Sequence, residues 1–266
     1  MLRDVRILIH KKLVRIVKEG AEWGTASLRD DVRRLSEQLT ENEARVEYLR
    51  HQLQHVERRN LSLAADRLAV DSSAAWALEN MPQALRFPDK LATLRHAIGE
   101  APTNGMALEF GVYTGATLRT IVEDFDGREV FGFDSFEGLP ENWRTGFPAG
   151  TFDVDGIPTV VGAEVVVGWY HDVLPGFLDE HSGPVTFLHV DCDLYSSTVT
   201  VLEHVGPRLV PGSVIVFDEY FNYPGWQDGE HLAWQEYVAK TGTSFTYLGY
   251  TLEDEQVAVQ IAAPPR

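Results

Sequence analysis

The chain has 266 residues, of which 44% are hydrophobic and 24% are charged. That length suffices for one sizeable core with an accessory segment and excludes two large domains. The single cysteine, Cys192, excludes an intramolecular disulfide and is typical of a reducing compartment. No run of about 18 apolar residues predicts a membrane span, and the N-terminus has no cleavage site typical of a secretory signal. We therefore expect a cytoplasmic protein.

The net charge of −17 is unevenly distributed along the chain. Residues 1–70 hold 14 of the 23 basic and 11 of the 40 acidic residues, a net charge of +3 that leaves −20 for the remainder. A domain this acidic repels phosphate backbones, which excludes nucleic acid as a partner. A small neutral or cationic acceptor suits it better, and clustered acids can hold a divalent metal.

Residues 1–24 are predicted to contain a basic amphipathic helix. Over 2–18 an apolar stripe faces one side and basic residues face the other, with Arg6 interrupting the stripe. Such a helix binds either a membrane surface or a protein surface. We favour a protein surface, because the stripe lacks the Trp or Phe typical of membrane-interface helices.

Residues 25–70 are predicted to form a coiled coil. From Leu28 to Leu63 apolar or Asn residues recur at alternating spacings of four and three. This is a heptad repeat, and Asn60 at an a position would fix the register of two parallel strands. A helix lying on its own domain is the alternative. The pattern predicts self-association as a homodimer or larger oligomer.

Residues 71–266 have the pattern of an α/β domain. After a predicted transition at 71–84, short apolar runs alternate with helical stretches. The expected strands span 107–110, 130–133, 165–167, 185–190, 213–217, 245–250 and 257–261. Because the runs are β-branched and separated by helices, they predict a Rossmann-like, seven-stranded, mostly parallel sheet. The last two runs predict an antiparallel hairpin at the sheet edge.

Two strand ends point to a cofactor that contains adenosine. Glu109 and the glycines Gly111 and Gly115 end the first strand, and Asp134 ends the second. Glycines permit close ligand approach, and a carboxylate at that second position can accept hydrogen bonds from ribose hydroxyls. Asp134 can alternatively cap a following helix. These features alone do not separate a methyl donor from a nicotinamide.

Carboxylates also end the fourth and fifth strands, at Asp191 and at Asp218 with Glu219. Adjacent parallel strands would bring these three acids together at the carboxyl edge of the sheet. Their mutual repulsion favours a bound cation, and oxygen ligands favour Mg²⁺, Ca²⁺ or Mn²⁺ over Zn²⁺. Helix capping at two separate turns is the alternative.

Four ordered motifs resemble the macrocin O-methyltransferase family. They read LEFGVYTG at 108–115, DSFEGLP at 134–140, DCDLYSST at 191–198 and FDEY at 217–220. The resemblance covers about residues 85–262 and implies a class I methyltransferase that uses S-adenosylmethionine and Mg²⁺ to methylate sugar hydroxyls. It places the metal ligands at Asp191, Asp218 and Glu219, although the last position is usually Asp in the family.

The predicted site has residues for the cofactor, for the acceptor's proton and for the acceptor itself. The cofactor-binding residues are predicted to be Glu109, Gly111, Tyr113, Gly115, Asp134, Ser135 and Asp172. Asp191 and His231 are the candidate bases that would accept the acceptor's proton. Residues 137–162 are predicted to form a lid, and the aromatic run 220–226 a sugar-stacking surface.

The predicted function is a metal-dependent O-methyltransferase acting on a sugar or another glycosylated product. A catechol methyltransferase would use the same chemistry, since vicinal hydroxyls chelate the metal in both cases. A nicotinamide-dependent reductase lacks its three-glycine loop here. A non-enzymatic coiled-coil scaffold would not need carboxylates at each of these strand ends.

Overall fold

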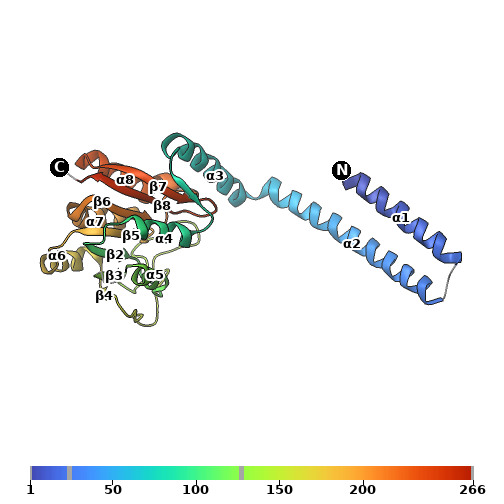
Figure 1. The fold of residues 1–266 in the computed structure, drawn as a ribbon, viewed down its shortest axis with the longest axis horizontal. Coiled ribbons are helices and arrows are strands. Elements are labelled where there is room, and N and C mark those ends of the chain that lie inside the picture. The colour runs from blue at the N-terminus through green and yellow to red at the C-terminus, as the bar shows by residue number, and fades with distance from the viewer. Residues whose placement is uncertain (1, 23–25, 126–128, 265–266) are drawn as a thin grey trace. The chain divides into compact units, whose positions relative to one another are not determined.

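The computed structural model describes residues 2–22, 26–125 and 129–264 (Figure 1). Within these ranges it does not describe the side chains of residues 2–6, 19–22, 26–28 and 57. The chain forms two compact units, Met1–Ala64 and Ala65–Arg266. Among the described residues, no helix combines the length and apolar character needed to cross a membrane.

The first unit is helical, as predicted, with α1 at Leu2–Glu22 and α2 at Ala26–Arg59. The predicted boundary between residues 24 and 25 lies outside the described residues. On α2 the heptad side chains of Leu35, Val46, Leu49 and Leu53 are each more than half exposed. The apolar seam of α2 is therefore largely uncovered within one chain.

The heptad pattern predicted a continuous helix through Leu63, but the helix is interrupted at Asn60. The Asn60 side-chain oxygen accepts hydrogen bonds from the backbone N–H groups of Ser62 and Leu63. These contacts satisfy donors at the start of α3 (Leu61–Asn80). Asn60 is thus a helix cap, and the predicted register-fixing role is wrong.

Helix α3 belongs mainly to the second unit and not to a loop-like transition. Ala69 and Ala77 are buried in the core, followed by Met81. Ser72 accepts a hydrogen bond from the Trp226 indole, and Ser73 accepts one from the backbone N–H of Asn222. The Asp-Ser-Ser sequence at 71–73 indicated a turn, yet both hydroxyls stabilise the packing of a helix.

The second unit contains one eight-stranded sheet in the order β1-β7-β8-β6-β5-β2-β3-β4. The strands are β1 (Leu85–Phe87), β2 (Met106–Phe110), β3 (Val130–Asp134), β4 (Glu164–Val167), β5 (Val185–Val190), β6 (Leu209–Phe217), β7 (Ser244–Thr251) and β8 (Val257–Ala263). Every pairing is parallel except those of β8 with β6 and β7. The Rossmann-like fold and the hairpin are confirmed.

Two details of the predicted sheet are corrected. The sheet has eight strands because β1 pairs in parallel with β7. The hairpin β7–β8 therefore lies inside the sheet, and β1 forms the edge. A three-residue strand carries too little alternation to be recognised from sequence.

Helices cover both faces of the sheet, as a buried parallel sheet requires. The helices of the second unit after α3 are α4 (Lys90–Glu100), α5 (Ala116–Asp124), α6 (Tyr170–Glu180), α7 (Tyr195–Val205) and α8 (Glu230–Thr241), with short 3₁₀ turns η1 (Gly206–Arg208) and η2 (Trp226–Asp228). Leu108 and Phe110 pack with α6, α7 and α8, whereas Ala107 packs with α4 and α5. Successive side chains of β2 thus pack against helices on opposite faces of the sheet. The site lies at the carboxyl ends of β2, β3, β5 and β6.

Candidate active site at the carboxyl edge of the sheet

A cavity of about 900 Å³ lies at the carboxyl ends of the central strands. Its wall includes the glycine loop after β2, the ends of β3, β5 and β6, and residues of the loop 137–162. This volume lies within the range of small-molecule sites. It lies where α/β sheets of this kind bind their ligands.

The loop after β2 contributes Gly111 and Tyr113 to the cavity wall. Gly111 has φ +98°, and a Cβ there would lie 1.6 Å from the backbone oxygen of Asp191. Tyr113 lines the cavity and has φ +48°, and Gly115 caps α5 at φ +75°. Only glycine fits at position 111, so the close approach of β2 and β5 depends on it.

Asp134 holds this loop in place. Its Oδ2 accepts hydrogen bonds from the N–H groups of Val112 and Tyr113, at 2.9 and 2.8 Å. Its Oδ1 accepts one from Phe136 at 2.8 Å. Since a carboxylate has roughly four acceptor positions, Asp134 retains capacity for one further donor. Asp134 and Ser135 both line the cavity, as predicted for cofactor-binding residues.

The acidic cluster predicted at the next two strand ends is brought together. Val190 of β5 is in register with Phe217 of β6, so the residues that follow these strands are neighbours. Besides Asp134, the cavity wall includes four carboxylates, which follow these two strands: Asp191, Asp193, Asp218 and Glu219. Asp193 does not cap α7, because no side-chain capping bond is made there.

The pKa values of these carboxyl groups reflect their burial and their mutual repulsion. Burial, followed by the charge of Asp218, raises the pKa of Asp191 and of Glu219 well above their usual values. Burial also raises the pKa of Asp193 to about 7. Such shifts indicate that the cluster favours protons or another cation. Lys90, the first residue of α4, places its ammonium 3.9 Å from Asp218 Oδ2.

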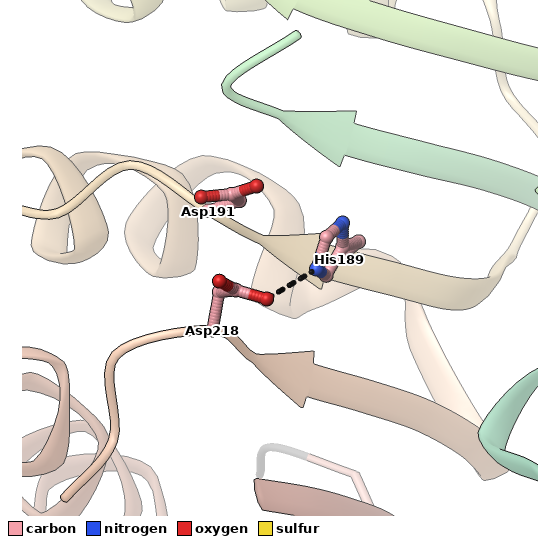
Figure 2. A group of neighbouring side chains, drawn as sticks. All are labelled: His189, Asp191 and Asp218. Carbon is pink, nitrogen blue, oxygen red and sulfur yellow. Dashed lines mark ion pairs between the residues drawn. The ribbon is translucent and has the colours of Figure 1, made fainter. Parts of the chain in front are cut away.

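Figure 2 shows that His189 lies beside Asp191 and Asp218, and potential ligand atoms of the three lie within 4.8 Å of one another. His189 Nε2 is 3.4 Å from Asp218 Oδ1, and Nδ1 is 3.0 Å from Glu109 Oε1. Burial opposes the charged imidazole, yet hydrogen bonds to Asp218 and Glu109 raise the pKa of His189 well above its usual value. The same contacts with His189 outweigh burial at Asp218 and lower the pKa of that carboxyl.

Four predicted site residues do not line the cavity, and one of them, Gly115, caps α5 instead. Glu109 is fully buried, and its side chain contacts His189 instead. Asp172 lies in the first turn of α6 with its side chain 65% exposed, whereas the neighbouring His171 lines the cavity. His231, predicted as a base, is also absent from the cavity wall.

His231 is packed in an aromatic cage. The rings of Trp76, Tyr220 and Trp226 lie 4.6 to 4.8 Å from its ring centroid. Burial lowers the pKa of His231 to about 4, and its Nδ1 has no hydrogen-bond partner among the described residues. A buried imidazole in this position serves packing, and the sequence offered no signal for its location.

The predicted stacking surface at 220–226 is also wrong. Tyr220, Phe221, Tyr223 and Trp226 are all at least 96% buried. These side chains pack in the core against α3. Ser72, Ser73 and Trp76 of that helix contact this segment. The aromatic wall of the cavity comes instead from the loop 137–162 and from strand-end loops, through Tyr113, Trp143, Phe147, Phe152 and Trp169.

Two contacts hold the loop 137–162 at the cavity. Arg144 Nη1 donates to both carboxylate oxygens of Glu255, at 2.9 and 3.0 Å, and the guanidinium stacks on Trp143. Ser196 at the start of α7 donates a hydrogen bond to Glu141 at 2.6 Å. Sequence reasoning missed Arg144, Lys90 and His189, because each acquires its partner only through tertiary pairing.

Comparisons with known proteins agree with this geometry. Residues 108–220 match the methyltransferase domain family Methyltransf_24. A tetracenomycin-derivative 4'-O-methyltransferase of Streptomyces olivaceus is 29% identical over 144 residues, covering 44% of this chain and 53% of the relative. Mycinamicin III 3''-O-methyltransferase of Micromonospora griseorubida is 27% identical over 161 residues, covering 49% and 62%. The chain thus spans little more than half the length of these relatives.

Solved structures show the same fold. The calicheamicin methyltransferase CalS11 matches with a TM-score of 0.52 at 22% identity, covering 77% of this chain and 92% of that one. The O-methyltransferase NovP matches with a TM-score of 0.51 at 22% identity, covering 64% and 78%. The predicted resemblance is supported: residues 108–220 match a methyltransferase domain, and the two relatives described above are named as O-methyltransferases.

Proposed function

We propose that this chain transfers the methyl group of S-adenosylmethionine to a sugar hydroxyl. One observation carries the proposal: a single cavity joins the glycine loop, the acidic cluster and an aromatic wall. The relatives' names, which describe O-methylation of glycosylated products, support the same reaction.

The residues at the glycine loop fit the methyl donor. Gly111 and Tyr113 line this part of the cavity, and Asp134 retains one acceptor position for a hydroxyl. Ser135, Trp169 and His171 complete this side of the cavity. The donor supplies an electrophilic methyl group; the chain's residues supply its alignment with the acceptor oxygen, which is the main requirement of an in-line displacement.

The acidic cluster fits a divalent cation. We propose that Asp191, Asp218 and Glu219 hold Mg²⁺ or Mn²⁺, because all three line the cavity and offer oxygen ligands. Glu219 Oε2 is buried and has no hydrogen-bond partner among the described residues. Such an orphaned oxygen favours a cation nearby. The metal would supply orientation and acidification of the acceptor hydroxyl.

The chain's own groups then account for the remaining steps. Asp191 lies at the cavity wall and is the proposed acceptor of the hydroxyl proton. Trp143 and Phe147 of the loop 137–162 cover the cavity and exclude water from the transfer. His231 is not retained as a base, since it is enclosed by aromatic side chains.

The aromatic wall favours a sugar acceptor. Trp143, Phe147 and Phe152 line the cavity, and flat aromatic faces pack well against the apolar face of a sugar ring. The test is a transfer assay with a labelled methyl donor, in which glycosides with vicinal hydroxyls compete with simple catechols. We expect methylated glycosides; labelled catechols alone would refute the sugar assignment, and no transfer to any hydroxyl would refute the proposed reaction.

A further inference from the structure

The buried row Glu109–His189–Asp218 connects the glycine loop strand to the acidic cluster. Glu109 lies on β2, His189 on β5, and Asp218 directly after β6, so the row crosses three adjacent strands. Glu109 is fully buried and His189 is 1% exposed. A buried carboxylate and imidazole are costly to desolvate unless they are paired. Their burial therefore needs an explanation beyond packing.

Both nitrogens of the His189 ring are engaged by carboxylates. Nδ1 contacts Glu109 at 3.0 Å, and Nε2 faces Asp218 at 3.4 Å (Figure 2). His189 could bind a metal directly only if the Nε2 contact with Asp218 were lost. Hard cations of the class proposed here prefer oxygen ligands, which leaves Asp191, Asp218 and Glu219 as the better set.

Asp218 has other contacts that restrict it. Gln256 Nε2 lies 3.2 Å from both the backbone oxygen and Oδ2 of Asp218. With Nε2 of His189 at Oδ1, each carboxylate oxygen has at least one neighbour that orients it, and Lys90 is a second neighbour of Oδ2. Partners behind a metal ligand fix its orientation in this way, and their loss typically weakens metal affinity about 10–100-fold.

We propose that His189 is a positioning residue for Asp218 and that Glu109 holds His189 in the required ring orientation. The inference rests on the proposed metal site and assigns a role to two residues outside the cavity wall. It explains why a glutamate, Glu109, is the next-to-last residue of β2 although its side chain does not line the cavity. Glu109 acts through β5 and β6 and does not touch the cofactor.

The test measures Mn²⁺ binding to the full chain by calorimetry, in wild type and three variants. His189→Leu removes both ring nitrogens and should weaken affinity at least tenfold. His189→Gln keeps an N–H donor near the Nε2 position and should recover most of that loss. Thr186→Val is the matched control, because Thr186 is fully buried on the same strand and its hydroxyl has no partner among the described residues.

Two further readouts separate the outcomes. Binding of S-adenosylhomocysteine should stay within about twofold of wild type in all variants, which reports on folding. Nitrogen coupling in the spin-echo spectrum of bound Mn²⁺ should be absent; its presence would make His189 a direct ligand and overturn the positioning role. Unchanged affinity in His189→Leu would overturn that role alone, whereas a wild-type chain that binds no Mn²⁺ would overturn the metal site and the role together.

Discussion

Asp134 contributes to the site by accepting hydrogen bonds from three backbone N–H groups. Asp134→Ala should weaken binding of S-adenosylhomocysteine by about 1.5–3 kcal/mol, since it removes charge-assisted hydrogen bonds and frees the loop. Calorimetry measures this loss. Glu137→Ala is a control at an exposed neighbour in the same loop. Wild-type affinity in the Asp134 variant would remove Asp134 from the cofactor site.

A variant of Asp218 should lower methyl transfer strongly without unfolding the chain. Asp218→Asn keeps the side-chain shape while removing a charge from the proposed metal site, so transfer in Mg²⁺ should fall by roughly 100-fold. The free energy of unfolding should fall by about 1–3 kcal/mol, because the contact of the charged carboxylate with His189 that lowers the Asp218 pKa is lost, and the chain should stay folded. A steady-state assay and urea unfolding check both values, and chelation with EDTA should abolish wild-type transfer. Full activity without divalent metal contradicts the proposal.

His231 makes a pH-dependent contribution to stability. Its pKa is about 4 in the folded chain against 6.5 for an ordinary histidine. Below pH 6.5 the unfolded chain binds a proton that the folded chain does not, so this contribution falls as pH drops from 6.5 to 4. The loss should be on the order of 2 kcal/mol.

The measurement compares urea unfolding of wild type and His231→Phe at pH 7.5 and 5. Buried carboxylates titrate in both proteins, so the difference between them isolates His231. The wild type should lose stability relative to the variant at pH 5. His55→Phe, at an exposed position on α2, should show no such difference.

The sequence is sufficient to place those residues that directly follow an apolar strand. Asp191, Asp218 and Glu219 follow apolar runs directly, and parallel pairing of β5 with β6 brings them together. His189 lies within the predicted strand 185–190 and is buried, but its contact with Glu109 joins residues 80 apart in the chain. His231 follows an aromatic run that the sequence predicted to be surface. Its burial depends on the packing of α3, which no local pattern reveals.

At the scale of elements, the loop 137–162 is the part that carries acceptor contacts. It has no helix or strand and is fixed by the Arg144–Glu255 and Glu141–Ser196 contacts. Its length and aromatic content predicted a role over the acceptor site. Its anchoring partners lie in the β7–β8 turn and at α7, so they could not be assigned from the sequence.

The loop and the aromatic core should respond differently to truncation. Trp143→Ala should raise the acceptor KM by about tenfold, since one aromatic contact contributes roughly 1–1.5 kcal/mol, and should barely change the Tm. Trp226→Ala removes a side chain that is 3% exposed and should cost about 3–5 kcal/mol of unfolding free energy. Steady-state kinetics and chemical denaturation test the pair. An unchanged KM in Trp143→Ala would exclude this loop from acceptor binding.

Seven of the strands were predicted because each is a run of at least four residues with β-branched or apolar character. The order of the strands in the sheet was not predicted, because strand pairing depends on contacts between distant segments. β1 is only three residues long, and β7 supplies its pairing partner from the far end of the chain. The heptads predicted α2 correctly, yet the same pattern hid the cap at Asn60 because Asn suits both roles.

At the scale of the whole chain, the first unit has no enzymatic group in the proposed mechanism. Its α2 carries an apolar seam in which Leu35, Val46, Leu49 and Leu53 are 55–63% exposed. Regularly spaced exposed leucines on a polar helix are the pattern of a coiled coil that lacks its partner. We propose that a second copy of this chain supplies it, because the heptads are self-complementary.

The expected state of the full chain is therefore a dimer or larger oligomer, measured by analytical ultracentrifugation. Leu49→Glu places a charge at the centre of the seam and should weaken association by at least tenfold, because a buried unpaired charge costs several kcal/mol. Tyr48→Glu is the matched control: Tyr48 is 62% exposed but lies outside the a and d positions. Both variants should bind S-adenosylhomocysteine as wild type does, since neither residue belongs to the second compact unit. A monomeric wild-type chain at micromolar concentration would rule the coiled coil out, and equal association of the two variants would place the interface elsewhere.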